Sequence, residues 1–312
     1  MSAIAILKES FNGQVFLFRF WLACLCLASA AFVNSGLQAD ESDRALFWSL
    51  SKQGATAGYL MGTIHSEDPR VLDFSEEFLQ KLEACDVFAM EMVPDLPTLT
   101  RLTDYMQYQD GRTLEGEIGV ERYEKVRATL SKYQVPADWV AGMKVWATVM
   151  TLSVPPPETG FFMDFSLSLR AAGAGLKVVG LETLEEQLSF LENMPSDQQL
   201  TLLDQALEQY DQVQEVHDEM VRNYLLGDLQ ALQAAAGEQL GELDQQTRDY
   251  FIGQGIDARN HRMLETLLPQ LQKARVFVAV GALHLPGQEG LIQLLRGAGY
   301  ELKPLALPFR TD

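Results

Sequence analysis

The hexapeptide LMGTIH at residues 60–65 returns near the other end of the chain as AVGALH at residues 279–284. Each is an apolar run that closes with Gly-x-x-His, a pattern typical of a short β-strand that ends where the chain turns. A glycine near the end of a strand allows a bend or a close approach by another backbone. We therefore expect His65 and His284 to occupy equivalent places, each just after the carboxyl end of a strand.

Two further strands are predicted to end in an acid. Short runs rich in Val, Ile, Leu, Phe or Met predict strands at Gly58–Ile64, Val87–Met92, Lys177–Leu181 and Val276–Val280. Glu91 and Glu182 lie at the ends of the second and third of these strands. Ligands of open α/β sheets bind at the carboxyl ends of the strands, and a carboxylate is costly to bury there unless it is paired or bound to a cation. The sequence thus predicts a site with two His and two Glu; alternatively, each Glu caps or pairs with a helix at the surface.

The remaining pattern is mainly helical. The apolar spacing at Phe74–Ala84 predicts a helix between the first two strands, and this strand-helix-strand order indicates that they pair in parallel. Helical patterns also cover Gly116–Thr151 and Glu185–Leu243. The proline-rich stretch Val154–Gly160 is interpreted as a connection inside one domain. We expect a single α/β domain at residues 40–312, with a central, largely parallel sheet and extensive helical insertions.

Residues 1–39 are predicted to be a signal peptide. The uncharged apolar run Phe20–Val33 follows Arg19 and is shorter than the roughly 20 residues that a membrane-spanning helix needs. Cleavage before Asp40 would release a secreted or periplasmic protein. The alternative is an uncleaved anchor helix at Gln14–Val33, which would be the chain's contact with the membrane.

Charge and composition exclude several classes of protein. The 312 residues include 24 Lys and Arg against 43 Asp and Glu, a formal net charge of −19. Because no run of Lys or Arg is longer than a pair, we expect no nucleic-acid partner. A hydrophobic content of 47% and a charged content of 21% are ordinary for a globular protein and argue against a polytopic membrane protein. The motifs of zincins, α/β-hydrolases and P-loop proteins are absent.

Four blocks of the sequence resemble the TraB/GumN family, which also contains the TIKI proteins. They are GTIH at 62–65, GLETLEEQL at 180–188, RN at 259–260 and VGALHLPGQEGLIQLLRGAGY at 280–300. The resemblance covers nearly the whole chain after the signal segment. It implies a divalent-metal-dependent peptidase in which His65, His284 and Glu91 form the active site. The Gly-x-Asp of the family matches Gly160–Asp164 only with a longer gap, so the role of Asp164 stays open.

The chemistry of these residue types agrees with that resemblance. Neutral imidazole and carboxylate oxygen are ligands of Mn, Co, Zn or Fe, and two His with Glu91 would leave positions open for water and substrate. Glu182 is the candidate general base. Arg259 could bind a substrate carboxylate or a developing oxyanion, and Asn260 could donate a further hydrogen bond. Alternatively, Arg259 pairs with an acid at the surface.

Two classes of function follow from these residues. One is a secreted, metal-dependent hydrolase of peptides or of small amides or esters. The other is a non-catalytic protein that sequesters a peptide, a metal ion or haem through the same histidines. The hydrolase needs Glu91 and a base, whereas sequestration could survive their loss, so substitution of Glu91 separates the two.

Overall fold

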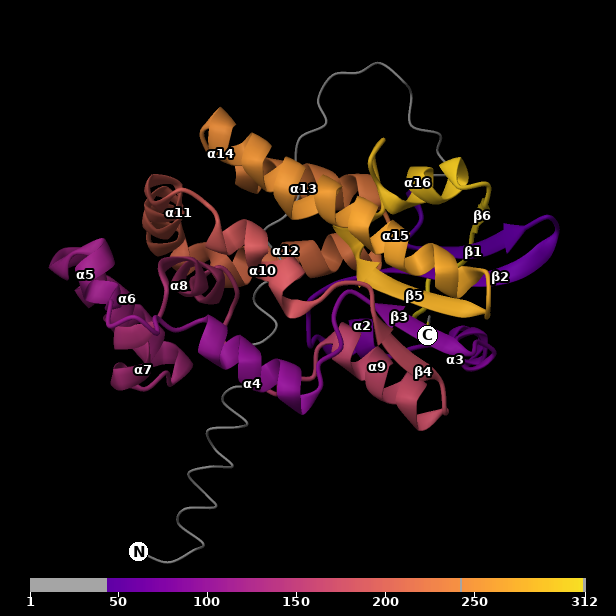
Figure 1. Cartoon of the computed structure of the whole chain (residues 1–312), viewed down its shortest axis with the longest axis horizontal. Coiled ribbons are helices and arrows are strands. Elements are labelled where there is room, and N and C mark those ends of the chain that lie inside the picture. The colour runs from indigo at the N-terminus through magenta and orange to yellow at the C-terminus, as the bar shows by residue number, and fades with distance from the viewer. Residues whose placement is uncertain (1–43, 242, 311–312) are drawn as a thin grey trace, which may run out of the picture. The chain divides into compact units, whose positions relative to one another are not determined.

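Six strands form one mixed sheet in the order β4-β3-β5-β2-β1-β6 (Figure 1). The computed structural model describes residues 44–241 and 243–310. The strands are β1 (Phe47–Lys52), β2 (Ala55–Thr63), β3 (Val87–Met90), β4 (Lys177–Gly180), β5 (Val276–Gly281) and β6 (Glu301–Pro304). β4, β3, β5 and β2 run parallel, whereas β1 pairs antiparallel with both β2 and β6. The predicted α/β fold with a largely parallel sheet is confirmed, and the predicted signal peptide lies outside the described residues.

The four parallel strands are those that the apolar runs predict. β3 is buried throughout and β5 almost throughout, as expected for strands covered on both faces. Thr63 of β2 pairs with Gly281 of β5, and Met90 of β3 pairs with both Ala279 and Gly180, so the four carboxyl ends lie at one edge of the sheet. The predicted pairing of the first two strands is wrong, because β5 lies between β2 and β3.

The described residues divide into two compact units, and the sheet belongs to the unit made of residues 44–93, 161–190 and 218–310. Its helices are α2 (Pro69–Leu72), α3 (Glu76–Glu83), α9 (Met163–Gly173), α13 (Leu229–Gly241), α14 (Gln245–Tyr250), α15 (Ala258–Leu271) and α16 (Leu291–Gly297). One hydrophobic core joins these helices, except α14, to the strands, with the Phe78 ring 5.1 Å from the Phe47 ring and 5.5 Å from the Phe277 ring. A π-helical segment, η5 (Phe251–Asp257), leads into α15, and a short 3₁₀ turn, η6 (Ala282–His284), follows β5.

The second unit, residues 94–160 and 191–217, is helical. Its helices are α4 (Leu96–Tyr105), α5 (Leu114–Ile118), α6 (Val120–Leu130), α7 (Ala137–Gly142), α8 (Val145–Leu152) and α11 (Ser196–Glu208), with short 3₁₀ turns η3 (Ser131–Tyr133) and η4 (Tyr210–Gln212). α8 is buried along its whole length. α10 (Leu184–Glu192) and α12 (Val213–Leu225) each contribute residues to both units. In the part of the chain that the structure describes, no helix is long and apolar enough to cross a membrane.

Gly62 allows β2 to approach the turn that carries His284. A Cβ atom at Gly62 would lie 2.9 Å from the Cα of Ala282 and 3.1 Å from a methyl carbon of Leu285, closer than packed atoms allow. We expect Gly62→Ala to lower the free energy of unfolding by about 1–3 kcal/mol, because the strand and the turn must move apart. Urea unfolding followed by circular dichroism measures this change.

Gly253→Ala is the matched control for that substitution, because a Cβ atom at Gly253 would meet no atom within 4 Å. It should change stability by no more than about 1 kcal/mol, since alanine is the better helix former. Equal effects of the two substitutions would contradict the close approach at Gly62.

Candidate active site

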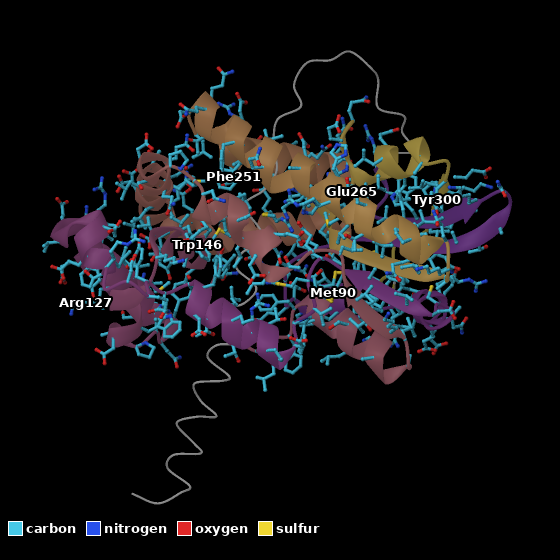
Figure 2. All side chains as sticks on the ribbon, in the orientation of Figure 1. Met90, Arg127, Trp146, Phe251, Glu265 and Tyr300 are labelled. Carbon is cyan, nitrogen blue, oxygen red and sulfur yellow. The ribbon has the colours of Figure 1, made fainter. Side chains whose placement is uncertain are left out.

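All four residues predicted at strand ends are buried at the carboxyl edge of the parallel strands. His65 follows β2, Glu91 follows β3, Glu182 follows β4 and His284 closes η6 after β5. Figure 2 marks Met90, the last residue of β3 and the neighbour of Glu91. Each of the four residues is only 5–6% exposed. The alternative in which the two acids pair with helices at the surface is therefore wrong.

Arg259 holds the two glutamates together. Its Nη2 atom donates to Glu91 Oε2 and to Glu182 Oε2, each at 2.6 Å, and its Nε atom lies 3.0 Å from Glu182 Oε2. The Arg259 side chain comes from the first turn of α15 and is 2% exposed. Arg259 thus pairs with acids, but in the interior of the unit and not at the surface, as the alternative expected. Its role in binding a substrate carboxylate or an oxyanion stays a prediction.

Glu91 receives two further hydrogen bonds. The backbone N–H of Gly281 donates to Oε1 at 2.7 Å, and the Gln187 side chain from α10 donates to Oε2 at 3.2 Å. Burial alone would raise the pKa of Glu91, but the charge of Arg259 and the hydrogen bonds from the Gly281 N–H and from Arg259 together lower that pKa below its ordinary value. Glu91 is therefore ionised under ordinary conditions.

The pKa of Glu182 is shifted in the opposite direction to that of Glu91. Burial raises the pKa of Glu182 above its ordinary value, although the charge and hydrogen bonds of Arg259 oppose the change. The two carboxylates face one fully buried guanidinium, and a second cation, Arg262, comes only to 3.8 Å from Glu182 Oε1. Of the two carboxylates, Glu182 is therefore the one that takes up a proton at the higher pH.

Asn260 fixes the tautomer of His284. The side-chain N–H of Asn260 donates to the backbone carbonyl of Glu289 at 2.8 Å, so its Oδ1 atom must face His284 Nδ1, 2.7 Å away. His284 Nδ1 therefore carries the proton, and Nε2 keeps its lone pair 3.8 Å from Glu91 Oε1. Burial lowers the pKa of His284 to about 4, so the ring is neutral at physiological pH. Asn260 orients a histidine here, and the predicted hydrogen bond to a substrate is not what its amide makes.

His65 is the least satisfied polar residue of the site. Both of its ring nitrogens are buried and make no hydrogen bond, and the ring stacks on Phe162 with the two centroids 4.1 Å apart. His65 Nδ1 lies 3.5 Å from Asp164 Oδ2, and Asp164 accepts a short hydrogen bond from the hydroxyl of Thr63. Asp164, whose role the sequence leaves open, is thus a neighbour of His65.

The nitrogens of both histidines fit a metal ion, although the predicted ligand set is not assembled as a closed site. Buried imidazole nitrogens that make no hydrogen bond are suited to bind a ligand, and His65 has two of them, although its Nδ1 also lies 3.5 Å from Asp164. His284 presents the lone pair of Nε2, and its Nδ1–H donates to Asn260. In a metal-binding histidine, the ring nitrogen that does not bind the metal usually makes such a hydrogen bond. Among residues 44–241 and 243–310, however, no three His, Cys, Asp or Glu side chains are grouped closely enough to hold an ion.

Sequence reasoning missed Gln187. Its signal is a polar side chain on the apolar face of α10, in phase with the buried residues Leu184, Leu188 and Leu191. Gln187 is 2% exposed, and its Oε1 atom makes no hydrogen bond. A buried amide on an apolar helix face points to a specific partner, which here is Glu91.

Comparison with known proteins agrees with the resemblance seen in the sequence. The chain is similar to Metalloprotease TIKI1 of Danio rerio, with 24% identity over 83% of this chain and 63% of the relative. It is also similar to Metalloprotease TIKI2 of Danio rerio (22% identity, 91% of this chain and 67% of the relative) and of Xenopus tropicalis (23% identity, 86% and 61%). The chain thus spans 61–67% of the length of these relatives.

No solved structure matches this chain. Residues 46–304 match the TraB/PrgY/gumN family. This range includes all strands of the described sheet and both histidines of the site. The chain therefore belongs to the TraB/PrgY/gumN family.

Proposed function

We propose that this chain is a divalent-metal-dependent hydrolase that acts on peptides or on small amides or esters outside the cytoplasm. The metalloprotease names of its relatives support the reaction class, and the predicted signal peptide at residues 1–39 supports the location. The observation that carries the proposal is the buried His65 ring, whose two nitrogens make no hydrogen bond at the carboxyl edge of the sheet. We assign His65, His284 and Glu91 as the metal ligands.

The charge of the buried cluster supports a bound cation. Glu91 and Glu182 bring two carboxylates to a single buried guanidinium, and His284 is neutral. Arg259 is the one fully buried base that faces these two buried acids, and Arg262, which is 36% exposed, comes only to 3.8 Å from Glu182, so the negative charge of the cluster is incompletely balanced. A divalent cation beside Glu91 or a proton on Glu182 would balance it. The free Nε2 atom of His284, 3.8 Å from Glu91, lies where such a cation would need a ligand.

The residues of this chain would then divide the chemistry among them. A bound Mn, Co, Zn or Fe ion would act as a Lewis acid and lower the pKa of a water molecule. Asn260 keeps His284 in the tautomer that can bind a metal, and Gly281 and Gln187 hold the carboxylate of Glu91 in place. Glu182, with its raised pKa, would accept a proton at a carboxylate oxygen. Arg259 is a positioning residue for both acids.

The sequestering protein remains the second candidate because of one observation. Both carboxylates of the cluster bond to Arg259, so neither faces open space as a general base. A protein that only holds a metal ion or a haem through His65 and His284 would not need a carboxylate free to act as a base. The two candidates differ in what substitution of Glu91 does, because the hydrolase needs this residue whereas metal binding by a sequestering protein would survive its loss.

Titration of Mn, Co and Zn into chelator-treated protein tests the proposal. We expect wild type to bind an ion and to cleave members of a fluorogenic peptide library. We expect metal binding and peptide cleavage to be lost in His65→Ala, His284→Ala and Glu91→Gln, because each substitution removes a ligand. Glu182→Gln should keep the metal and lose about 100-fold or more in turnover, the size of a general-base contribution.

The matched control is His261→Ala, which removes an exposed histidine that pairs with Glu289 and should bind and cleave like wild type. A folded wild type that binds no ion would contradict the assigned metal site. Metal binding without turnover of any peptide, amide or ester would favour sequestration instead.

A further inference from the structure

The start of α9 holds His65 at the carboxyl edge of the sheet. Phe162, which precedes the helix, stacks on the face of the His65 ring with the two ring planes 15° apart. The backbone N–H of Met163 donates to the carbonyl of Ser66 at 3.1 Å. Asp164 Oδ2 lies 3.5 Å from His65 Nδ1. Three successive residues thus contact the turn that carries His65, and all of them belong to the same compact unit as the sheet.

The Asp164 carboxylate is itself held in place. Its Oδ1 atom accepts a short hydrogen bond from the hydroxyl of Thr63, the last residue of β2. Asp164 is the second residue of α9, where the free backbone N–H groups of the first turn stabilise a negative charge. The residue is only 9% exposed. Asp164 therefore presents a fixed, buried and negatively charged oxygen to the edge of the His65 ring.

This charge favours one tautomer of His65. With the proton on Nε2, the lone pair of Nδ1 would face the carboxylate of Asp164, and the two would repel each other. With the proton on Nδ1, the positive end of the N–H bond faces the same carboxylate. At 3.5 Å the contact is longer than a hydrogen bond, so the attraction is electrostatic, and the burial of both groups strengthens it. The Nδ1–H tautomer is therefore the more stable one, and Nε2 keeps its lone pair.

His284 has a corresponding arrangement, in which Asn260 Oδ1 lies 2.7 Å from His284 Nδ1. Each histidine of the two Gly-x-x-His units is thus approached at Nδ1 by a side-chain oxygen from the first turn of a helix, α9 for His65 and α15 for His284. The paired strands β2 and β5 bring both histidines to one edge of the sheet. In both rings the lone pair is therefore on Nε2.

We propose that Asp164 is a positioning residue for His65: it keeps the proton on Nδ1 and leaves Nε2 as the atom that binds a ligand. An acid beside the outer nitrogen of a metal-binding histidine orients the ring and makes it a stronger ligand. The effect of Asp164 on a metal ion rests on the proposed function. The tautomer is a property of the metal-free chain, so the two parts of the proposal are tested separately.

Nitrogen-15 NMR of the metal-free chain measures the tautomer of His65. The chain has four histidines, and His65→Asn identifies the ring signals of His65 by their loss. We expect wild type to have the proton on Nδ1. Asp164→Leu and Asp164→Asn remove the negative charge, so both should move the His65 signals toward the Nε2–H tautomer. The His284 signals should not move, which shows that the site is still folded.

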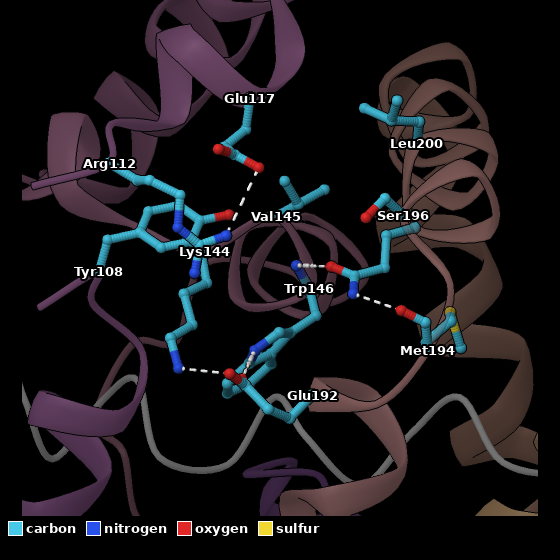
Figure 3. Close-up of a pocket in the computed structure, with 11 residues that line it drawn as sticks. Tyr108, Arg112, Glu117, Lys144, Val145, Trp146, Glu192, Met194, Ser196 and Leu200 are labelled. Carbon is cyan, nitrogen blue, oxygen red and sulfur yellow. Dashed lines mark hydrogen bonds and ion pairs between the residues drawn. The ribbon is translucent and has the colours of Figure 1, made fainter. Parts of the chain in front are cut away.

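Asp197→Asn is the matched control. Asp197 is the second residue of α11, as Asp164 is of α9, but it is exposed and follows Ser196 at a pocket of the helical unit (Figure 3). This substitution should leave the His65 signals unchanged. A wild-type His65 with its proton on Nε2 would overturn the proposal, and so would a folded Asp164→Asn with the His65 signals of wild type.

Calorimetric titration of Mn and Zn tests the effect on a metal ion. Asp164→Asn should bind about 10–100-fold more weakly than wild type, whereas Asp197→Asn should bind equally well. Equal affinities of wild type and Asp164→Asn would overturn the effect of Asp164 on the ligand. A wild type that binds no ion, but has an Nδ1–H tautomer that Asp164→Asn loses, would contradict the proposed function and support the positioning role of Asp164.

Discussion

Replacing Arg259 by Met should lower the free energy of unfolding by about 3–5 kcal/mol, the effect of leaving buried charges without a partner. The guanidinium forms ion pairs at 2.6 Å with both Glu91 and Glu182, whose side chains are 7% and 0% exposed. Methionine fills a similar volume but donates no hydrogen bond, so two acids would have to stay buried side by side or take up protons. Urea unfolding at pH 7.5 measures the loss.

An exposed arginine provides the comparison for that experiment. Arg127 lies on α6, where Figure 2 shows its side chain pointing away from the helix, and it pairs with Glu124 at 2.8 Å. Arg127→Met should change stability by no more than about 1 kcal/mol, because a surface ion pair contributes little. Adding Glu182→Gln to Arg259→Met should restore part of the loss, since only one buried carboxylate then lacks a cation. Similar losses for Arg259→Met and Arg127→Met would contradict the buried cluster.

The parallel strands could be predicted because each is a short apolar run that closes with a polar residue. β3 and β5 follow this rule most clearly, and both are almost fully buried. The order of the strands could not be predicted, because the insertion of β5 between β2 and β3 is a pairing between distant parts of the chain. Local sequence contains no signal for such a pairing.

Two strands, β1 and β6, were missed for a different reason. β1 (FWSLSK) contains two Ser and a Lys, and in β6 (ELKP) only Leu302 is buried. Such strands resemble loops in sequence, since three residues of β1 are only partly buried and three of the four residues of β6 are exposed. They form because β2 offers β1 a free edge, and β1 in turn offers an edge to β6.

The position of the site could be predicted, but its contacts could not. Strand topology alone brings Glu91, Glu182 and His284 to one edge of the sheet. The partners of Arg259 depend on how α15 packs on that edge, which the sequence does not specify, and both acids proved to be those partners. In the same way, the sequence shows Asn260 but does not show that the backbone carbonyl of Glu289 orients its amide.

The stability of the metal-free chain should fall as the pH is lowered from 7.5 to 5, and His284 should cause a defined part of the fall. Burial lowers the pKa of His284 from 6.5 to about 4, so the folded chain keeps this ring neutral where the unfolded chain protonates it. Between these two values the unfolded state binds more protons, and acid therefore favours unfolding. The shift in this pKa lowers the free energy of unfolding by about 2 kcal/mol at pH 5 and by roughly 3 kcal/mol at pH 4.

The two acids beside His284 have opposite effects on this profile, so the histidine must be isolated by a variant. The lowered pKa of Glu91 removes stability at still lower pH, as pH falls through that folded-state value, whereas the raised pKa of Glu182 adds stability as the pH falls. His284→Asn removes the buried ring, and its stability should fall by about 2 kcal/mol less than that of wild type between pH 7.5 and pH 5. His261→Asn is the control, because His261 is an exposed histidine paired with Glu289 at 2.6 Å. Urea unfolding in the presence of a chelator at both pH values gives the comparison. Parallel profiles for wild type and His284→Asn would show that folding does not lower the pKa of the buried ring, and would contradict this prediction.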